Sequence, residues 1–115
     1  MRMAYFARPT TDFGQWREER DIKSIRRAGF SVIDITNNET QDLYKDIGMC
    51  VFRPLVESAD ALFFRSFDDG SIGAGVAKEI YWATCAHIPI FELPLFVFDR
   101  AMSVADTREK IRASQ

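Results

Sequence analysis

The chain has 115 residues, a formal net charge of −2 at pH 7, and 47% hydrophobic residues. These values are typical of one soluble globular domain, which we expect to span residues 1–115. The charge gives no electrostatic reason to expect a nucleic acid partner. No apolar run approaches the roughly 20 residues of a membrane span. The first seven residues are too short for a signal peptide, so we expect a cytoplasmic protein.

The cysteines and the histidine give no sign of a metal site. Cys50 and Cys85 lie far apart and in no metal-ligand spacing, so we expect free, buried thiols. The single histidine, His87, follows a predicted helix, where a cation suits the helix dipole. We therefore expect no metal and no cofactor.

Short apolar runs alternate with helical patterns along the chain. Strands are predicted at residues 3–7, 30–35, 61–67 and 90–93, with one more short strand at 95–98. Helices are predicted at residues 13–28, in parts of 41–57, from about 75 to 86, and at 104–113. This alternation predicts an α/β fold of the flavodoxin-like or Rossmann-like kind. It has a mainly parallel sheet of about four to five strands, with helices on both faces.

The helical patterns also predict which side chains face the core. In the first helix these are Phe13, Trp16, Ile22 and Ile25. In the stretch 41–57 the inward positions are Leu43, Ile47, Val51, Leu55 and Val56. Pro54 predicts a break or kink near the end of that stretch.

The stretch from Asp68 to Ala83 links the third predicted strand to a helix. A turn at the carboxyl end of a strand is where open α/β sheets usually bind ligands. Glu79 shares an edge with the buried face of this helix, where a carboxylate is costly unless it is used. The alternative is a partly exposed glutamate that stabilises the first turns of the helix.

Other candidate residues surround Glu79 in the predicted topology. Asp69-Gly70 is a turn signal, and Asp69 is also a candidate acid partner for Glu79. The segment 73–75 does not fit the G-x-G-x-x-G spacing, but it fits a bend where backbone amides meet an anion such as phosphate. Tyr5 is expected either in the core or as a pocket hydroxyl. Arg8 follows the first strand, where it could pair with an anion or a carboxylate.

Together these segments resemble the nucleoside 2-deoxyribosyltransferase superfamily, which includes the 2′-deoxynucleoside 5′-monophosphate N-glycosidases. The resemblance covers roughly residues 3–93. Its first part, Tyr5-Phe6-Ala7-Arg8-Pro9, is similar to the family's first strand and loop. Its second, residues 58–64, is similar to a polar-x-Asp sequence before an apolar strand. The most specific part runs from Asp69-Gly70 through Gly75 and Glu79 to Ala83, followed by residues 88–90.

The resemblance implies an enzyme that cleaves or exchanges the N-glycosidic bond of 2′-deoxynucleosides or their 5′-monophosphates. Glu79 would be the nucleophile that attacks the anomeric carbon, and Tyr5 would orient it. Asp60 would contact the base or support the acid. The chemistry is the two-carboxylate chemistry of retaining glycosidases. The resemblance also implies a homodimer or a higher homo-oligomer.

One position departs from the family pattern. The family often places Asp or Ser six residues before the glutamate, and here that residue is Gly73. Asp69 is then the predicted acid, supplied from a longer loop. The predicted substrate-binding residues are Phe6, Arg8, Asp60, Ser71, Gly73 and Gly75. The missing side chain favours the alternative, a nucleotide-binding or sensing module that has lost the chemistry. A flavodoxin-like binding protein without nucleotide preference is a third reading, which rests on the fold alone.

Overall fold

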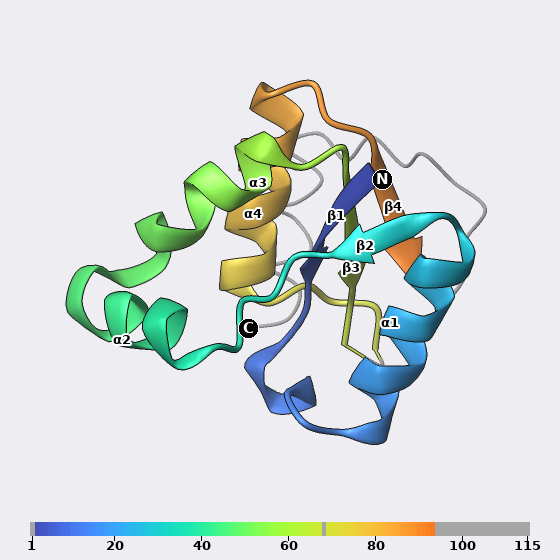
Figure 1. The fold of residues 1–115 in the computed structure, drawn as a ribbon, viewed down its shortest axis with the longest axis horizontal. Helices are drawn as coiled ribbons and strands as arrows, with labels where there is room; N and C mark the ends of the chain where they lie inside the picture. Colours follow the sequence, from blue (N-terminus) through green and yellow to red (C-terminus); the bar gives the residue numbers. More distant parts are fainter. Residues whose placement is uncertain (1, 68, 94–115) are drawn as a thin grey trace.

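The computed structural model describes residues 2–67 and 69–93, so the predicted strand 95–98 and helix 104–113 lie outside the described residues (Figure 1). The strands are β1 (Arg2–Ala7), β2 (Phe30–Val32), β3 (Ala61–Arg65) and β4 (Ile90–Leu93). The α-helices are α1 (Trp16–Arg27), α2 (Asn38–Ile47), α3 (Arg53–Ser58) and α4 (Ala74–Cys85). Two 3₁₀ segments, η1 (Thr10–Asp12) and η2 (Gly48–Phe52), complete the described elements.

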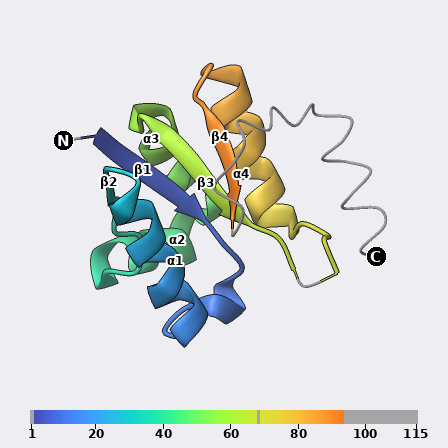
Figure 2. The same cartoon turned by 90° about the vertical axis from the view of Figure 1, so that its right-hand side faces the viewer.

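The described strands form one parallel sheet with the order β2-β1-β3-β4. Figure 1 shows α1 on one side of this sheet and α3 and α4 on the other, and Figure 2 looks onto the strands. The predicted α/β fold is therefore confirmed. The chain leaves β1 toward β2 on one side and returns to β3 on the other. Such a reversal places the usual ligand site of this architecture at the carboxyl ends of β1 and β3.

Each face of the sheet packs against its own set of helices, because successive side chains of a strand point to opposite faces. The core on the α1 side contains Ala4, Phe6, Ile25, Ala61, Phe63 and Leu93. The core on the α3 and α4 side includes Tyr5, Ala7, Val56, Leu62, Phe64, Val76, Ile80 and Ala83. The central strands β1 and β3 are thus buried on both faces, as their continuous apolar runs predicted.

The first helix begins later than predicted. Helix α1 starts at Trp16, and the side chain of this residue is 67% exposed instead of facing the core. Its ring lies 4.8 Å from the guanidinium carbon of Arg20 on the helix surface. The predicted inward position of Ile25 is correct, since this side chain is fully buried against the sheet.

The stretch 41–57 was predicted as one partly helical run with a single inward stripe, and this prediction is wrong for Leu43 and Ile47. Both side chains are exposed, and α2 contains no buried residue. Gly48, with a φ of 79°, ends α2 in a left-handed conformation that favours glycine. A 3₁₀ segment follows and changes the helical phase. Pro54 then lies in the first turn of α3, where its missing N–H costs no hydrogen bond.

Both cysteines are free, as predicted, but they are exposed and not buried. Cys50 lies in η2, outside the core, and Cys85 is the last residue of α4. Among residues 2–67 and 69–93, no helix is long and apolar enough to cross a membrane.

A buried ion pair joins α1 to the end of β3. The guanidinium of Arg65 donates through Nε and Nη2 to the carboxylate of Asp21, with 2.8 Å between Nη2 and Oδ1. The Asp21 side chain is 3% exposed and that of Arg65 9%. This two-pronged contact fixes α1 at the carboxyl end of β3, close to where the ligand site of the fold is expected.

We predict that Asp21→Asn lowers the free energy of unfolding by about 1.5–3 kcal/mol, because the charge-assisted hydrogen bonds between the Asp21 carboxylate and Arg65 are weakened. Urea unfolding followed by circular dichroism measures this change. Glu19→Gln on the same helix is the matched control, since Glu19 forms an exposed pair with Lys23. Its expected effect is about 0.5 kcal/mol or less. Equal losses in both variants would contradict a special role for the buried pair.

Candidate active site

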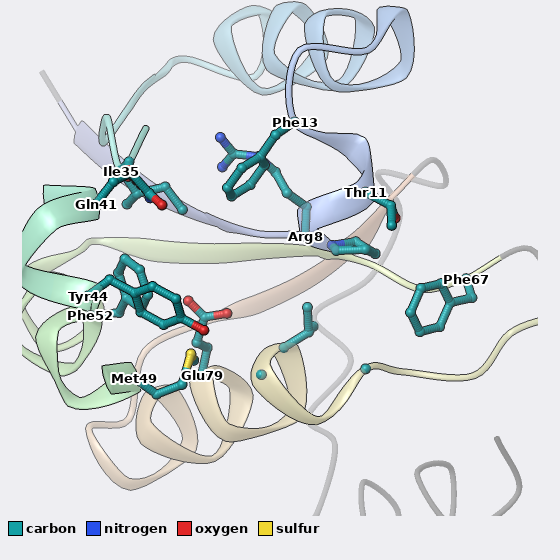
Figure 3. A pocket seen from close by; sticks show the side chains of 14 residues that line it. Arg8, Thr11, Phe13, Ile35, Gln41, Tyr44, Met49, Phe52, Phe67 and Glu79 are labelled. Atoms are coloured by element: carbon teal, nitrogen blue, oxygen red, sulfur yellow. Dashed lines mark hydrogen bonds between the residues drawn. The ribbon is translucent and has the colours of Figure 1, made fainter. Parts of the chain in front are cut away.

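A cavity of about 260 Å³ opens at the carboxyl end of β1, between α4 and the segment that contains α2 and η2 (Figure 3). Most of its wall is apolar or aromatic, as is common in small-molecule sites. Its lining residues are Arg8, Pro9, Thr11, Phe13, Ile35, Gln41, Tyr44, Met49, Phe52, Phe67, Gly73, Gly75, Val76 and Glu79.

Glu79 lies in the cavity wall and is 5% exposed. Its carboxylate Oε2 accepts a hydrogen bond from the hydroxyl of Tyr5, which is itself fully buried in the middle of β1. Of the two interpretations left open by the sequence, the partly exposed surface glutamate is thus excluded. The Tyr5 side chain belongs to the core, and its hydroxyl also reaches the carboxylate at the cavity.

Burial is the largest influence on the pKa values of Glu79 and Tyr5. It raises the pKa of Glu79 to about 7, while the hydrogen bond from Tyr5 and the positive charge of Arg8 act in the opposite direction. The pKa of Tyr5 is raised by its burial and by the neighbouring Glu79 carboxylate. The phenol therefore stays protonated at neutral pH and serves as the donor of the pair. Glu79 divides between its carboxylate and carboxylic acid forms near pH 7.

Arg8 supplies a fixed positive charge to the cavity wall. Its Nε donates to Glu18 Oε2 at 2.8 Å, and its Nη1 donates to the carbonyl oxygen of Phe6 at 2.8 Å. The guanidinium carbon lies 4.7 Å from the ring centre of Phe6 and 5.0 Å from that of Phe13. These contacts hold the side chain in one orientation. The partner Glu18 balances much of its charge.

The structure does not bring Asp69 to the cavity. Its exposed carboxylate accepts hydrogen bonds from the backbone N–H and the hydroxyl of Ser71, at 2.9 and 2.5 Å. The bonds from Ser71 lower the pKa of Asp69. A carboxyl group with a lowered pKa is ionised at neutral pH and is a poor proton donor. Ser71 is buried within this turn and does not line the cavity.

Gly73 and Gly75, which the sequence predicted to bind substrate, line the cavity. Gly73 caps the amino end of α4, and Gly75 lies in its first turn. The first N–H groups of a helix have no partner within the helix and favour negative charge nearby. A Cβ at Gly75 would lie 3.5 Å from the Met49 side chain, an ordinary contact distance. The two glycines therefore keep backbone accessible at this end of the helix without being sterically required.

Two predicted substrate-binding residues lie elsewhere. Asp60 precedes β3 and so lies at the amino edge of the sheet, where its Oδ2 accepts a hydrogen bond from the backbone N–H of Met3 at 2.7 Å. Phe6 follows Tyr5 in β1, so its side chain points to the opposite face and packs in the core beside α1. Its ring reaches the site only through its contact with Arg8.

The sequence interpretation missed the wall formed by α2 and η2. This wall contributes Gln41, Tyr44, Met49 and Phe52 to the cavity, with the rings of Tyr44 and Phe52 5.3 Å apart. One signal was present: two aromatic residues within 44–52 do not fit the predicted inward stripe. In the described part of the chain, no group of three or more His, Cys, Asp and Glu residues could hold a metal ion.

Comparison of the chain with known protein families, with curated proteins and with solved structures gives no match.

The raised pKa of Glu79 predicts a specific dependence of stability on pH. Between its ordinary pKa of 4.5 and about 7, the folded chain keeps a proton that the unfolded chain releases. Stability should thus fall as pH rises through this window, by up to about 3 kcal/mol. We expect Glu79→Gln to remove this loss, because the amide cannot ionise.

Urea unfolding of both chains at pH 5 and pH 8 measures the effect. Glu79→Gln should raise the free energy of unfolding more at pH 8 than at pH 5, and the two increases should differ by about 2–3 kcal/mol. Both chains share every other titrating group, so the difference between their free energies of unfolding reports the ionisation of Glu79 alone. A difference that does not change with pH would show that Glu79 does not titrate in this window.

Proposed function

We propose that the protein cleaves or transfers the N-glycosidic bond of 2′-deoxynucleosides or their 5′-monophosphates, through a covalent intermediate on Glu79. The carrying observation is the buried Glu79 carboxylate, hydrogen-bonded by Tyr5, in the wall of a cavity of mainly apolar and aromatic lining. A buried carboxylate that no described residue joins in an ion pair is costly and is typical of sites that use it. The resemblance to the nucleoside 2-deoxyribosyltransferases supports the same assignment.

In the first step, a carboxylate oxygen of Glu79 attacks the anomeric carbon of the deoxyribosyl group. The bond between this carbon and the base nitrogen breaks, and its electron pair stays on the base, which takes up a proton. The product is a glycosyl ester of Glu79. In the second step, water or another base attacks the same carbon, and the ester oxygen leaves as the carboxylate. Each displacement inverts the configuration of the anomeric carbon, so the two steps together retain it.

Tyr5 positions the nucleophile in this proposal. Its hydroxyl engages one carboxylate oxygen and leaves the other for attack. The hydrogen bond also favours the ionised form of Glu79, which burial alone would suppress. Among the described lining residues Glu79 is the single carboxylate. We therefore assign the proton taken up by the leaving base to solvent and not to Asp69.

The lack of a second carboxylate in the described lining also favours a second candidate, a binding or sensing module with the same cavity. Such a module would be stabilised by a nucleoside or nucleotide without turning it over. The homodimer or higher homo-oligomer that the resemblance implies, and a cytoplasmic location, complete the proposal.

Replacement of the nucleophile tests the enzymatic proposal. We expect Glu79→Ala and Glu79→Gln to lower base release by about 10³-fold or more, because neither side chain can form the glycosyl ester. Free base is followed by chromatography with each deoxynucleoside and each 5′-monophosphate. Glu57→Gln, an exposed glutamate on α3, is the control and should keep the full rate. A full rate in either Glu79 variant would show that Glu79 is not the nucleophile. If a deoxynucleoside or its 5′-monophosphate raises the Tm of the unsubstituted chain without release of base, the binding module is favoured.

Tyr5→Phe should move the pH dependence of the rate. The variant loses the hydrogen bond that lowers the pKa of Glu79 while burial remains, so the ionised nucleophile forms at higher pH. We expect the rising limb of kcat, centred near pH 7 in the unsubstituted chain, to shift upward, and the rate at pH 7 to fall. Tyr81→Phe is the matched control on an exposed residue of α4. An unshifted limb in Tyr5→Phe would contradict this role.

A further inference from the structure

We propose that Glu18, which lies on α1 and does not line the cavity, is a positioning residue for the reaction. It binds Arg8 and so keeps Arg8 from forming an ion pair with the nucleophile, Glu79. The catalytic consequence rests on the proposed function, because it concerns the attack by Glu79. The arrangement of the three side chains does not rest on it and can be followed without turnover.

Arg8 is bound to one carboxylate while it shares a cavity wall with another. Arg8 and Glu79 both line the cavity, but in the described part of the chain the ion-pair partner of Arg8 is Glu18. The Nε of Arg8 lies 2.8 Å from Glu18 Oε2. Figure 3 shows the guanidinium beside the Phe13 ring and away from the Glu79 carboxylate. Arg8 is thus directed toward α1 and not toward the nucleophile.

Glu18 is the one charged partner among the described contacts that hold Arg8. The other contacts are with neutral groups, the carbonyl oxygen of Phe6 and the rings of Phe6 and Phe13. A hydrogen bond that involves ions is about twice as strong as one between neutral groups. Glu18 is itself held, since its Oε1 accepts from the backbone N–H of Gly14 at 3.2 Å. The fixed carboxylate therefore determines the orientation of Arg8.

The attacking oxygen of Glu79 stays free because of this arrangement. Tyr5 donates to Oε2 of Glu79, so Oε1 is the oxygen that remains for attack. Without Glu18, Arg8 would carry an unbalanced charge with only 3% of its side chain exposed. Glu79 is the single carboxylate among the described lining residues, and a guanidinium pairs readily with a carboxylate. The free oxygen of Glu79 would then bind Arg8 and become a weaker nucleophile.

The other charges around α4 leave Arg8 as the cation that matters for Glu79. Beside Arg8, the described titratable groups that face Glu79 are the phenols of Tyr5 and Tyr44. The charged residues of α2, and Lys78 on α4 itself, are exposed. The remaining elements packed on α4 carry Arg53 and Glu57, which pair at the surface, Arg65, which pairs with Asp21, and Glu92. Among the described charges, Arg8 is the one that acts on the pKa of Glu79, which it lowers.

A pH titration of the Glu79 side-chain carboxyl carbon by NMR tests the inference. The signal is identified by its absence from Glu79→Gln. We expect a midpoint near pH 7 in the unsubstituted chain. In Glu18→Gln the midpoint should be lower by about one pH unit or more, because Arg8 then pairs with Glu79. Glu19→Gln removes an exposed charge from the same helix and, as the control, should leave the midpoint near 7.

A second substitution separates an ion pair from a loosened core. Exposure of Glu79 to water would also lower its midpoint, toward the ordinary pKa of 4.5. Adding Arg8→Gln to Glu18→Gln removes the cation, so the midpoint should return to pH 7 or above. A midpoint that stays low in this double variant overturns the inference. So does a midpoint that Glu18→Gln leaves unchanged, or that Glu19→Gln lowers as much.

The unsubstituted chain provides a test that needs no folded variant of Glu18. NMR of the arginine side-chain nitrogens follows the Nε–H of Arg8. If Glu18 holds this group throughout, its signal should persist, protected from exchange with water, while Glu79 titrates. Loss of the signal as Glu79 ionises would show that Arg8 leaves Glu18, and would overturn the inference.

Kinetics connect the position of Arg8 with the proposed reaction. In Glu18→Gln we expect the rising limb of kcat for base release at lower pH, and its plateau about tenfold lower, because the attacking oxygen is hydrogen-bonded. An unchanged plateau overturns the effect on attack. Base release by the unsubstituted chain with an unmoved midpoint in Glu18→Gln overturns the role of Glu18 and keeps the enzyme. A lowered midpoint without base release from the unsubstituted chain supports the placement of Arg8 and contradicts the enzyme.

Discussion

The hydrogen bond between Tyr5 and Glu79 is the contact on which the site depends. It joins the middle of β1 to the second turn of α4 across 74 positions of sequence, inside the core. A buried carboxylate costs free energy in proportion to its lost hydration, and one phenol offsets only part of that cost. The packing of α4 on the sheet must supply the rest, through the core that Ile80 shares with Leu62 and Phe64. The core therefore stabilises a group that would be more stable in water, as is common at functional sites.

A second constraint sets the charge around this pair. Arg8 favours the ionised form of Glu79, and it does so from a fixed place because Glu18 and two aromatic rings hold its guanidinium. A free arginine could form a direct ion pair with the carboxylate, which would lower its pKa and its reactivity. Glu18 engages Arg8 instead, and burial raises the pKa of Glu79 to about 7. Helix α1, on the opposite face of the sheet, thus influences the cavity without lining it.

The sequence was sufficient for the fold and for the side of the cavity built on β1 and α4. The four described strands lie where apolar runs predicted them, and Tyr5, Arg8 and Glu79 meet because the carboxyl ends of parallel strands share one edge. The same rule could have excluded Asp60, which precedes its strand and so lies at the other edge. Strand alternation could have excluded Phe6, whose neighbour Tyr5 points to the opposite face. Both were chosen by resemblance and not by geometry.

The other side of the cavity was not predictable from periodicity, because Gly48 divides the stretch 41–57 and changes its phase. The helix that results has no buried residue, so core packing places little constraint on its sequence. Gln41 and Tyr44 therefore face the cavity from an element that can change without loss of the core. The cavity thus has one side fixed by the sheet and α4 and another side on a surface helix. Such a division lets the lining of the cavity change on the side where the stability of the core does not oppose it.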